Sequence, residues 1–573
     1  MQFGANIRSR FKVPAQDRRV FFYILVLGLG LRLWGVTQPL LDYASWRQTF
    51  TAMIARNFYR SGMELLAPQI DVIGVQNFAA FPLFPAIVSL FYHITGVWEG
   101  WGRLTAVFCA LGVQLQIWYL ARSLFSSRAA HAAAALFAIL PMAVYYTRVF
   151  MPEPLLLLFG ISAINALHTW LVTRHWRWMG AAVAALALSF VLKISSLYLA
   201  APWIMIFLTA ALRHNSRSVF LITMACAAAT LALALLPAWA WYVWLPAHST
   251  NAASSLISAS SSVGSQFFKS EAWLMRLLIW SQPDTWIKLF GSRLLEYHLT
   301  WLVALLLAGS GIHWVISHWR ESRQGAERQQ YSRRERWNQA AAFYQRRAGL
   351  FILLSWFTGM LIFMAAFPVF NVLHEYYQLP LILPAALLGG QAWVYVWQKT
   401  ARCKQWIRLS LGILFWGGTL TLSLYRLQDR LQINWQYWQE AQAMRQHSAP
   451  RQKVAILDTM PHPELYYYAD RQGYVLPVFA HGNILPGQNA AEFSNFAAAE
   501  FQRLRALGVP LLLVRDMQYP LISGPFLDQL QRSCRQLWRP ASKAAAPWTG
   551  IWSMDCEMQT DHKVLMQPGR PNR

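Results

Sequence analysis

Long apolar stretches separated by short polar segments run through most of the chain. About 20 consecutive apolar residues form a helix long enough to cross the roughly 30 Å hydrocarbon layer of a bilayer. We expect about eleven such spans, at residues 20–36, 104–121, 130–147, 155–171, 180–194, 198–212, 218–237, 297–317, 349–367, 379–398 and 407–425. The first stretch follows "RSRFKVPAQDRR" and has no small-residue cleavage site, so we expect it to be retained as a span. The pattern predicts a polytopic α-helical membrane protein.

The charges of the connecting segments predict the orientation of these spans. Cytoplasmic loops carry an excess of Lys and Arg, and every second connection is basic; the longest, residues 318–348, holds eight Arg against three Glu. We therefore expect a multi-pass protein of a bacterial inner membrane with a cytoplasmic N-terminus. The apolar stretch 81–97 would invert this partition if it crossed the membrane, so we expect it to form a helix at the outer interface.

Two outer loops and a C-terminal region complete the expected organisation. The first loop, 37–103, is rich in aromatic and polar residues, and the second, 248–296, begins with a Ser- and Ala-rich stretch. Beyond about residue 440, short apolar segments such as "KVAILD" alternate with amphipathic helical patterns, as is typical of a small α/β domain. We expect a transmembrane domain over 1–430 and a periplasmic α/β domain over 440–573.

The composition supports a membrane protein and argues against a nucleic-acid partner. Of the 573 residues, 56% are hydrophobic and 13% are charged, and the mean hydropathy is +0.28. Soluble proteins have about a quarter charged residues. The net charge of +25 falls largely in short connecting loops, where the positive-inside rule explains it.

Two of the five cysteines, Cys534 and Cys556, lie in the expected outer domain. An oxidising periplasm permits a disulfide between them, which would close a loop of about 20 residues and contribute roughly 3 kcal/mol. Two free thiols are the alternative. The sequence has no Cys/His spacing typical of a structural zinc site.

Asp42 lies directly after the first predicted span, in "LLDYASWRQTF". One interpretation is a helix N-cap, since an Asp at this position accepts hydrogen bonds from the first free N–H groups. However, Arg47 and Gln48 interrupt the apolar positions of the helix that follows, which favours a polar cavity open to the outer aqueous side. A carboxylate at the rim of such a cavity is a candidate general base, because desolvation raises its pKa.

Two further predicted turns bring charged residues to the same outer level. Arg148 and Glu153 lie in "YYTRVFMPEP", where the alternative is a simple interface turn with a snorkelling Arg. Lys193 in "VLKISSLY" and Arg103 in "WEGWGRL" either reach the membrane surface or meet an anion inside the protein.

A third segment, "HEYYQLPLILP", lies between the ninth and tenth predicted spans. An aromatic belt at the membrane interface explains Tyr376 and Tyr377. It does not explain His374 and Glu375 directly ahead of them, so we treat this segment as a candidate part of a site.

The order of these features resembles membrane glycosyltransferases that use polyprenyl-phosphate sugars. In particular, it resembles glycosyltransferase family 39, which includes protein O-mannosyltransferases and lipid A aminoarabinose transferases. The matching features are the acid after the first span, "FPLFP", the Gly-Arg that opens the second span, "YYTRVFMPEP", Lys193, "HEYYQLPLILP" and the tail segment "PELYYYADRQGYVLP". The resemblance covers most of the chain and implies a GT-C fold with about 11 to 13 spans.

The resemblance also implies an activity and roles for individual residues. Such an enzyme transfers a sugar from a polyprenyl-phosphate carrier to an acceptor on the outer face, with inversion at the anomeric carbon, and Asp42 would be its base. The candidates for binding the donor phosphate are Arg148, Lys193, Arg103, His374 and Arg47. The candidates for the sugar or acceptor pocket are Glu153, Tyr376, Tyr377, Trp46 and Gln48.

The chain departs from the family pattern at two places. Many members have a second acid where this chain has Tyr43, and many bacterial members have a Lys before the segment that corresponds to "FPLFP". A phosphate contact at that place would have to come from another residue, for which Arg47 is a candidate. We assign no cofactor, because the sequence gives no reason to assign the divalent metal that is possible in some relatives.

The alternatives belong to other functional classes. A flippase or transporter of lipid-linked sugars would have a similar polar cavity without a base, and a ligase would transfer whole glycans from diphosphate carriers. A non-catalytic subunit of such a complex is the third alternative. Inverted repeats with broken helices would favour a transporter, and the sequence shows none. The sugar and the acceptor (a protein, a lipid or a glycan) stay open.

Overall fold

The computed structural model describes residues 14–73, 80–212, 216–245, 279–326, 347–458, 462–477, 490–515, 525–541 and 547–557. The predicted Ser- and Ala-rich loop from 248 to 270 and most of the basic loop 318–348 lie outside the described residues. The chain forms two compact units. The membrane unit comprises Met1–Thr37 and Asn77–Leu431, and the sheet unit comprises Gln38–Gln76 and Gln432–Arg573.

All regular secondary structure in the described part of the membrane unit is helical. Its helices up to the second outer loop are α2 (Ala15–Leu33), α4 (Leu83–Thr95), α5 (Gly100–Leu124), α6 (Ser127–Ile139), α7 (Pro141–Tyr146), α8 (Glu153–Thr173), α9 (Trp176–Leu192), η1 (Ile194–Leu199), α10 (Ala200–Ala211), α11 (Arg217–Trp239) and η2 (Ala240–Trp244). The later helices are α15 (Pro283–Trp286), η3 (Ile287–His298), α16 (Trp301–Ala326), α18 (Ala348–Ala366), α19 (Pro368–Leu373), η4 (Glu375–Leu381), α20 (Ile382–Lys399), η5 (Thr400–Arg402) and α21 (Gln405–Arg430).

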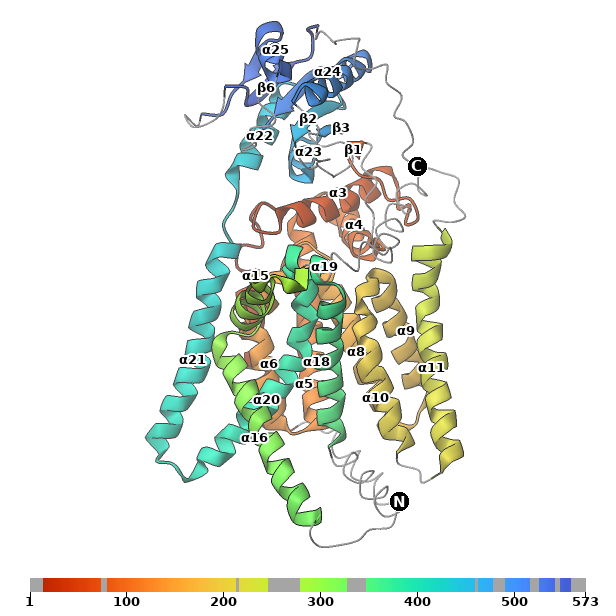
Figure 1. Ribbon diagram of the computed structural model, residues 1–573, viewed down its shortest axis with the longest axis vertical. Coiled ribbons are helices and arrows are strands. Elements are labelled where there is room, and N and C mark those ends of the chain that lie inside the picture. Colours follow the sequence, from red (N-terminus) through yellow and green to blue (C-terminus); the bar gives the residue numbers. More distant parts are fainter. Residues whose placement is uncertain are drawn as a thin grey trace. The chain divides into compact units, whose positions relative to one another are not determined.

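Small residues allow the helices of this unit to pack closely. The Ala-rich α6 packs along α20 (Figure 1), and a Cβ added at Gly390 of α20 would lie 2.6 Å from the carbonyl oxygen of Ala129. Glycine is therefore required there, because any side chain would separate the two backbones. A neighbouring group of helices is formed by α8, α9, α10 and α11.

Within the described residues, seven helical segments are long and apolar enough to cross a membrane. They are Gly100–Leu124, Glu153–Thr173, Ile194–Ala211, Arg217–Trp244, Ala348–Ala366, Glu375–Arg402 and Gln405–Gln446. The pair Pro283–His298 and Trp301–His313, bent by 105°, brings the number to eight within the described part of the chain. The protein is therefore a multi-pass membrane protein.

The predicted count of eleven spans stays a prediction. Each of the eleven predicted stretches overlaps a helix. Three of these helices are either too short or too highly charged for a typical span. The helix α6 has 13 residues because Pro141 breaks the predicted third span, and α9 has 17 residues. The helix α2 is long enough but carries four charged residues, Asp17, Arg18, Arg19 and Arg32.

The sheet unit is built around a six-stranded sheet with the order β1-β3-β2-β4-β6-β5. Its strands are β1 (Val72–Ile73), β2 (Val454–Asp458), β3 (Gly473–Pro477), β4 (Leu511–Val514), β5 (Gln536–Trp538) and β6 (Gly550–Ser553). The first four strands in this order are parallel, while β6 pairs antiparallel with both β4 and β5. Its helices are α3 (Ser45–Ser61), α22 (Trp435–Gln446), α23 (Pro463–Ala469), α24 (Ala490–Ala506) and α25 (Pro525–Ser533).

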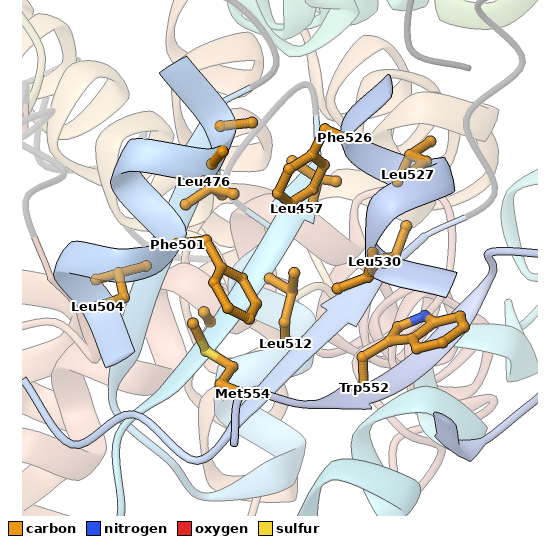
Figure 2. Close-up of a cluster of buried hydrophobic side chains, with 14 of the residues drawn as sticks. Leu457, Leu476, Phe501, Leu504, Leu512, Phe526, Leu527, Leu530, Trp552 and Met554 are labelled. Carbon is orange, nitrogen blue, oxygen red and sulfur yellow. The ribbon is translucent and has the colours of Figure 1, made fainter. Parts of the chain in front are cut away.

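One face of this sheet is covered by α24 and α25. Phe501 of α24 and Leu530 of α25 reach Leu457 and Leu512 of the central strands, and Trp552 of β6 closes the cluster (Figure 2). These side chains are at most 4% exposed, so the cluster is a hydrophobic core for this unit.

Cys534 and Cys556 form a disulfide in the sheet unit. Their Cα atoms lie 5.3 Å apart, and 22 positions separate them in the sequence. Among the described residues, Cys109 is a buried free thiol, and Cys226 and Cys403 are exposed free thiols.

The first outer loop is divided between the two units. We expected the whole of residues 37–103 to belong to the transmembrane domain, but residues 38–76 belong to the sheet unit and α4 belongs to the membrane unit. The physical reasons are that α3 packs against α23 of the sheet unit and that β1 extends the sheet by pairing with β3.

Candidate functional site

Lys193 lies where a membrane helix breaks. It follows the last residue of α9 in an extended conformation, with φ −160° and ψ 113°, and the 3-10 helix η1 begins at the next residue. Its Nζ atom lies 3.2 Å from Oε1 of Glu153, the first residue of α8. The Lys193 side chain is 14% exposed and the Glu153 side chain 2%, so the ion pair is largely shielded from solvent.

Two aromatic rings complete the surroundings of the Lys193 amine. Nζ lies 3.7 Å from the ring centroid of Tyr377 and 4.6 Å from that of Tyr376, both within the range of cation–π attraction. We call Glu153, Lys193, Tyr376 and Tyr377 the lysine cluster. It brings together residues that the sequence analysis took from three separate segments.

The segment that carries the two tyrosines is held by a buried carboxylate. Glu375 is 3% exposed and accepts hydrogen bonds from the Tyr146 hydroxyl and from a guanidinium nitrogen of Arg430, each at 2.8 Å. His374, which is exposed, stacks on Tyr376 with 5.2 Å between ring centroids. These contacts fix η4, and with it both tyrosines of the lysine cluster.

Arg430 and Tyr146 were not predicted as site residues. Each lies near the end of a predicted span, and each contacts a residue more than 50 positions away. A signal was present for Arg430, because Glu375 needs a positively charged partner if it is buried. The sequence did not say which Arg would supply it.

Arg103 and Arg148 form a second group in the membrane unit. Both are buried, and each donates a hydrogen bond to the carbonyl oxygen of Gly35, at 2.6 Å from Arg103 and 3.5 Å from Arg148. The turn that carries Arg148 packs against α5 through Phe150, whose ring would clash with a Cβ at Gly102. Two guanidinium groups are thereby held close to one another.

Asp42 belongs to the sheet unit and is 2% exposed. It accepts a hydrogen bond from the side-chain amide of Gln48, and its carbonyl oxygen accepts the Ser45 N–H at 2.8 Å. The N-cap interpretation does not hold, because the N-cap of α3 is Ala44 and no side chain caps this helix. The Asp42 carboxylate is therefore buried beside an amide donor.

The other predicted residues of the first loop lie on the first turn of α3. The Trp46 ring stacks on Phe50, with 5.2 Å between centroids and 8° between planes. The guanidinium of Arg47 lies 6.0 Å from the same Phe50 ring. The helix that follows Asp42 thus carries Trp46, Arg47 and Gln48 on its first turn.

The membrane unit also contains a cavity away from the predicted site residues. A cavity of about 410 Å³ in the membrane unit is lined by Arg128, His131, Trp393, Trp397 and Trp416, among others, and by no predicted site residue. Within the described ranges, no group of three or more His, Cys, Asp and Glu side chains is arranged to hold a metal ion.

The comparisons with known proteins agree with this architecture. Residues 80–244 match the sequence model of the family described as dolichyl-phosphate-mannose-protein mannosyltransferase, and this range contains Arg103, Arg148, Glu153 and Lys193. No curated protein sequence matches the chain.

Two solved structures are similar to the chain over most of its length. One is the oligosaccharyltransferase AglB from Archaeoglobus fulgidus in complex with an inhibitory peptide and a dolichol-phosphate, at a TM-score of 0.52 and 13% identity over 87% of this chain and 69% of AglB. The other is ArnT from Cupriavidus metallidurans bound to undecaprenyl phosphate, at a TM-score of 0.51 and 14% identity over 93% of this chain and 97% of ArnT.

The protein has the GT-C fold. Identities this low establish the fold alone, but together with the family match they confirm the enzyme class predicted from the sequence, a glycosyltransferase. In this GT-C glycosyltransferase, the family match covers the segments of the membrane unit that carry Lys193, Glu153, Arg103 and Arg148.

Proposed function

We propose that this GT-C glycosyltransferase transfers a sugar from a polyprenyl-phosphate donor to an acceptor on the outer face of a bacterial inner membrane. The observation that carries the proposal is the lysine cluster: a shielded ammonium group flanked by one carboxylate and two tyrosine rings. The ligands of the two similar structures, a dolichol-phosphate and undecaprenyl phosphate, support a donor of this class.

The cations of the membrane unit suit the leaving group of this reaction. When the bond between the anomeric carbon and the phosphate oxygen breaks, negative charge develops on the lipid phosphate, and charged donors stabilise it. Lys193 is the first candidate for this role because its amine is pre-positioned. Arg103, Arg148, His374 and Arg47 are further candidates for the same phosphate.

The Glu153 carboxylate is suited to accept a hydrogen bond from a sugar hydroxyl. One of its carboxylate oxygens accepts from Lys193, while the other is buried and has no hydrogen-bond partner among the described residues. A buried acceptor without a donor costs free energy, which a hydroxyl of the bound sugar would recover. Tyr376, Tyr377, Trp46 and Gln48 are further candidates for binding the sugar or the acceptor.

Asp42 is our candidate base. In a single inverting displacement, the acceptor oxygen or nitrogen bonds to the anomeric carbon as the phosphate leaves, and the acceptor proton passes to a base. A carboxylate performs this step if it lies within hydrogen-bond reach of the acceptor. Asp42 is buried and oriented by Gln48, so its carboxylate is held in a defined position.

The test uses the purified full chain reconstituted in lipid vesicles with radiolabelled polyprenyl-phosphate sugars and matching polyprenyl-diphosphate glycans. We expect binding and slow release of free sugar from one monophosphate donor. Lys193→Met should weaken donor binding at least tenfold, while Lys399→Met should not; Lys399 is an exposed lysine whose amine lies 5.5 Å from the Tyr395 ring.

Each alternative gives a different result in the same assay. Cleavage of diphosphate donors alone would support a ligase. Movement of the intact donor across the vesicle membrane without cleavage would support a flippase. Either result contradicts the proposed function.

A further inference from the structure

The loop that carries Asp42 is attached to the sheet unit on its N-terminal side. The N–H of Leu40 donates to the hydroxyl of Tyr468 at 2.6 Å. The carbonyl oxygen of Leu41, the residue directly before Asp42, accepts the N–H of Asn434 at 2.8 Å. Leu40 and Leu41 are fully buried, so neither hydrogen bond competes with bulk water.

The loop is attached on its C-terminal side as well. Ser45, the first residue of α3, donates its hydroxyl to Oε1 of Glu464 at 2.7 Å. Glu464 is 1% exposed, so this is a charge-assisted hydrogen bond in a buried setting. Because the Ser45 N–H also closes a turn on the Asp42 carbonyl, the position of Ser45 determines the backbone position of Asp42.

Both side-chain anchors belong to one short helix, α23. All seven of its residues are buried. Tyr466 donates its hydroxyl to the carbonyl oxygen of Tyr474 in β3 at 2.8 Å, and His462, directly before the helix, pairs with Asp458 at the end of β2 at 3.2 Å. The helix is thus fixed to two parallel strands in the middle of the sheet.

We propose that α23 positions the candidate base, with Tyr468 and Glu464 as positioning residues that act through Leu40 and Ser45 rather than on the substrate. The inference rests on the proposed function, since it assigns a purpose to the position of Asp42. The base must lie within about 3 Å of the atom whose proton it removes. A displacement of about 1 Å can reduce the rate about a hundredfold. The α/β fold of the C-terminal region is therefore a part of the active enzyme.

The test combines amide hydrogen exchange with kinetics on the full-length protein. Tyr468→Phe removes only the hydroxyl that accepts from Leu40, and Glu464→Ala removes the acceptor of Ser45. We expect exchange in residues 38–48 to become about tenfold faster in each variant. The kcat for donor hydrolysis should fall at least tenfold, with KM for the donor unchanged. Exchange in β4 should keep its wild-type rate.

Matched variants separate positioning from general loss of structure. Tyr425→Phe makes the same chemical change at an exposed tyrosine of α21 that has no part in holding α23, so exchange in residues 38–48 and kcat should stay at wild-type values. Glu464→Gln keeps an oxygen that accepts from Ser45 and should recover most of the activity lost in Glu464→Ala. The double variant Ser45→Ala/Glu464→Ala should be no slower than the slower single variant.

Two results overturn the inference, and they differ from a failure of the proposed function. Unchanged exchange in residues 38–48 in both Tyr468→Phe and Glu464→Ala would show that α23 does not hold this loop. Faster exchange with wild-type kcat, in a protein whose Asp42→Asn variant is inactive, would show that the base tolerates movement. If Asp42→Asn itself keeps full activity, the base assignment fails, and the inference fails with it.

Discussion

The amine of Lys193 and the carboxylate of Glu153 form an ion pair of 3.2 Å between two helix ends of the membrane unit. Removing one partner of a buried pair leaves the other charge uncompensated, which costs about 3–5 kcal/mol. We therefore expect Lys193→Met alone to lower the stability of the protein by about this amount. The measurement is thermal unfolding in detergent, with Lys399→Met as the control.

The double variant Lys193→Met/Glu153→Leu distinguishes structure from function. It removes both charges and replaces them with apolar side chains of similar volume, so we expect most of the lost stability to return. Donor binding should not return, because the phosphate ligand is still missing. Recovery of binding in the double variant would contradict the assignment of Lys193.

The second prediction concerns the attachment of α3 to the sheet unit. Arg56 lies 2.6 Å from Asp71, and both side chains are at most 7% exposed. Asp71→Asn should therefore destabilise the protein by about 3–5 kcal/mol. The exposed pair of Arg60 and Asp470, also at 2.6 Å, provides the contrast. Arg60→Ala should cost less than about 1 kcal/mol, since water screens this pair. Equal losses in chemical denaturation would contradict the prediction.

The third prediction is a dependence of stability on pH that arises from His462 and Asp458. Burial lowers the pKa of His462, but hydrogen bonds with Asp458 and Glu464 and the charge of Asp458 outweigh it and raise this pKa to about 9. Burial raises the pKa of Asp458, but the hydrogen bond and charge of His462, together with Arg515, lower it to about 2.

A raised histidine pKa contributes stability that is complete below the unfolded value of 6.5 and is lost as the pH rises toward 9. We expect the stability difference between wild type and His462→Gln to shrink by roughly 3 kcal/mol across this range. At the acid end, the contribution of Asp458 should be lost as the pH falls from about 4 to 2. Thermal melting of both proteins at a series of pH values measures these differences, and a difference independent of pH would contradict them.

The fourth prediction concerns the disulfide between Cys534 and Cys556. Without reductant, neither Cys534 nor Cys556 should be alkylated in the intact protein, because their sulfur atoms are bonded to one another. The exposed thiol of Cys403 should react. Because the bond closes a loop of 22 positions, the double variant Cys534→Ser/Cys556→Ser should lose roughly 3 kcal/mol of stability. Alkylation of Cys534 at the rate of Cys403 would contradict the pairing.

Each of the eleven predicted apolar stretches overlaps a helix of the membrane unit, because hydrophobic length is a local property of the sequence. The break at Pro141 between α6 and α7 was not predicted. Charged and aromatic residues at the outer ends of the predicted spans singled out Glu153, Lys193, Tyr376 and Tyr377, and the resemblance to a family gave them roles. The structure brings these four residues into one cluster.

Contacts between residues far apart in the sequence were not predictable in this way. The hydrogen bond between Leu40 and Tyr468 spans 428 positions, and β1 is only two residues long. Neither leaves a local pattern that would assign residues 38–76 to the sheet unit. The partner of Glu375 was missed for the same reason, since Arg430 is 55 positions away.

The most direct test of Asp42 as the base compares donor turnover in wild type, Asp42→Asn and the exposed control Asp429→Asn, using the monophosphate donor that wild type binds. We expect that all three bind the donor with similar affinity, that Asp429→Asn turns it over at the wild-type rate and that Asp42→Asn is at least a hundredfold slower. Turnover by Asp42→Asn at the wild-type rate would contradict the central claim that Asp42 is the base.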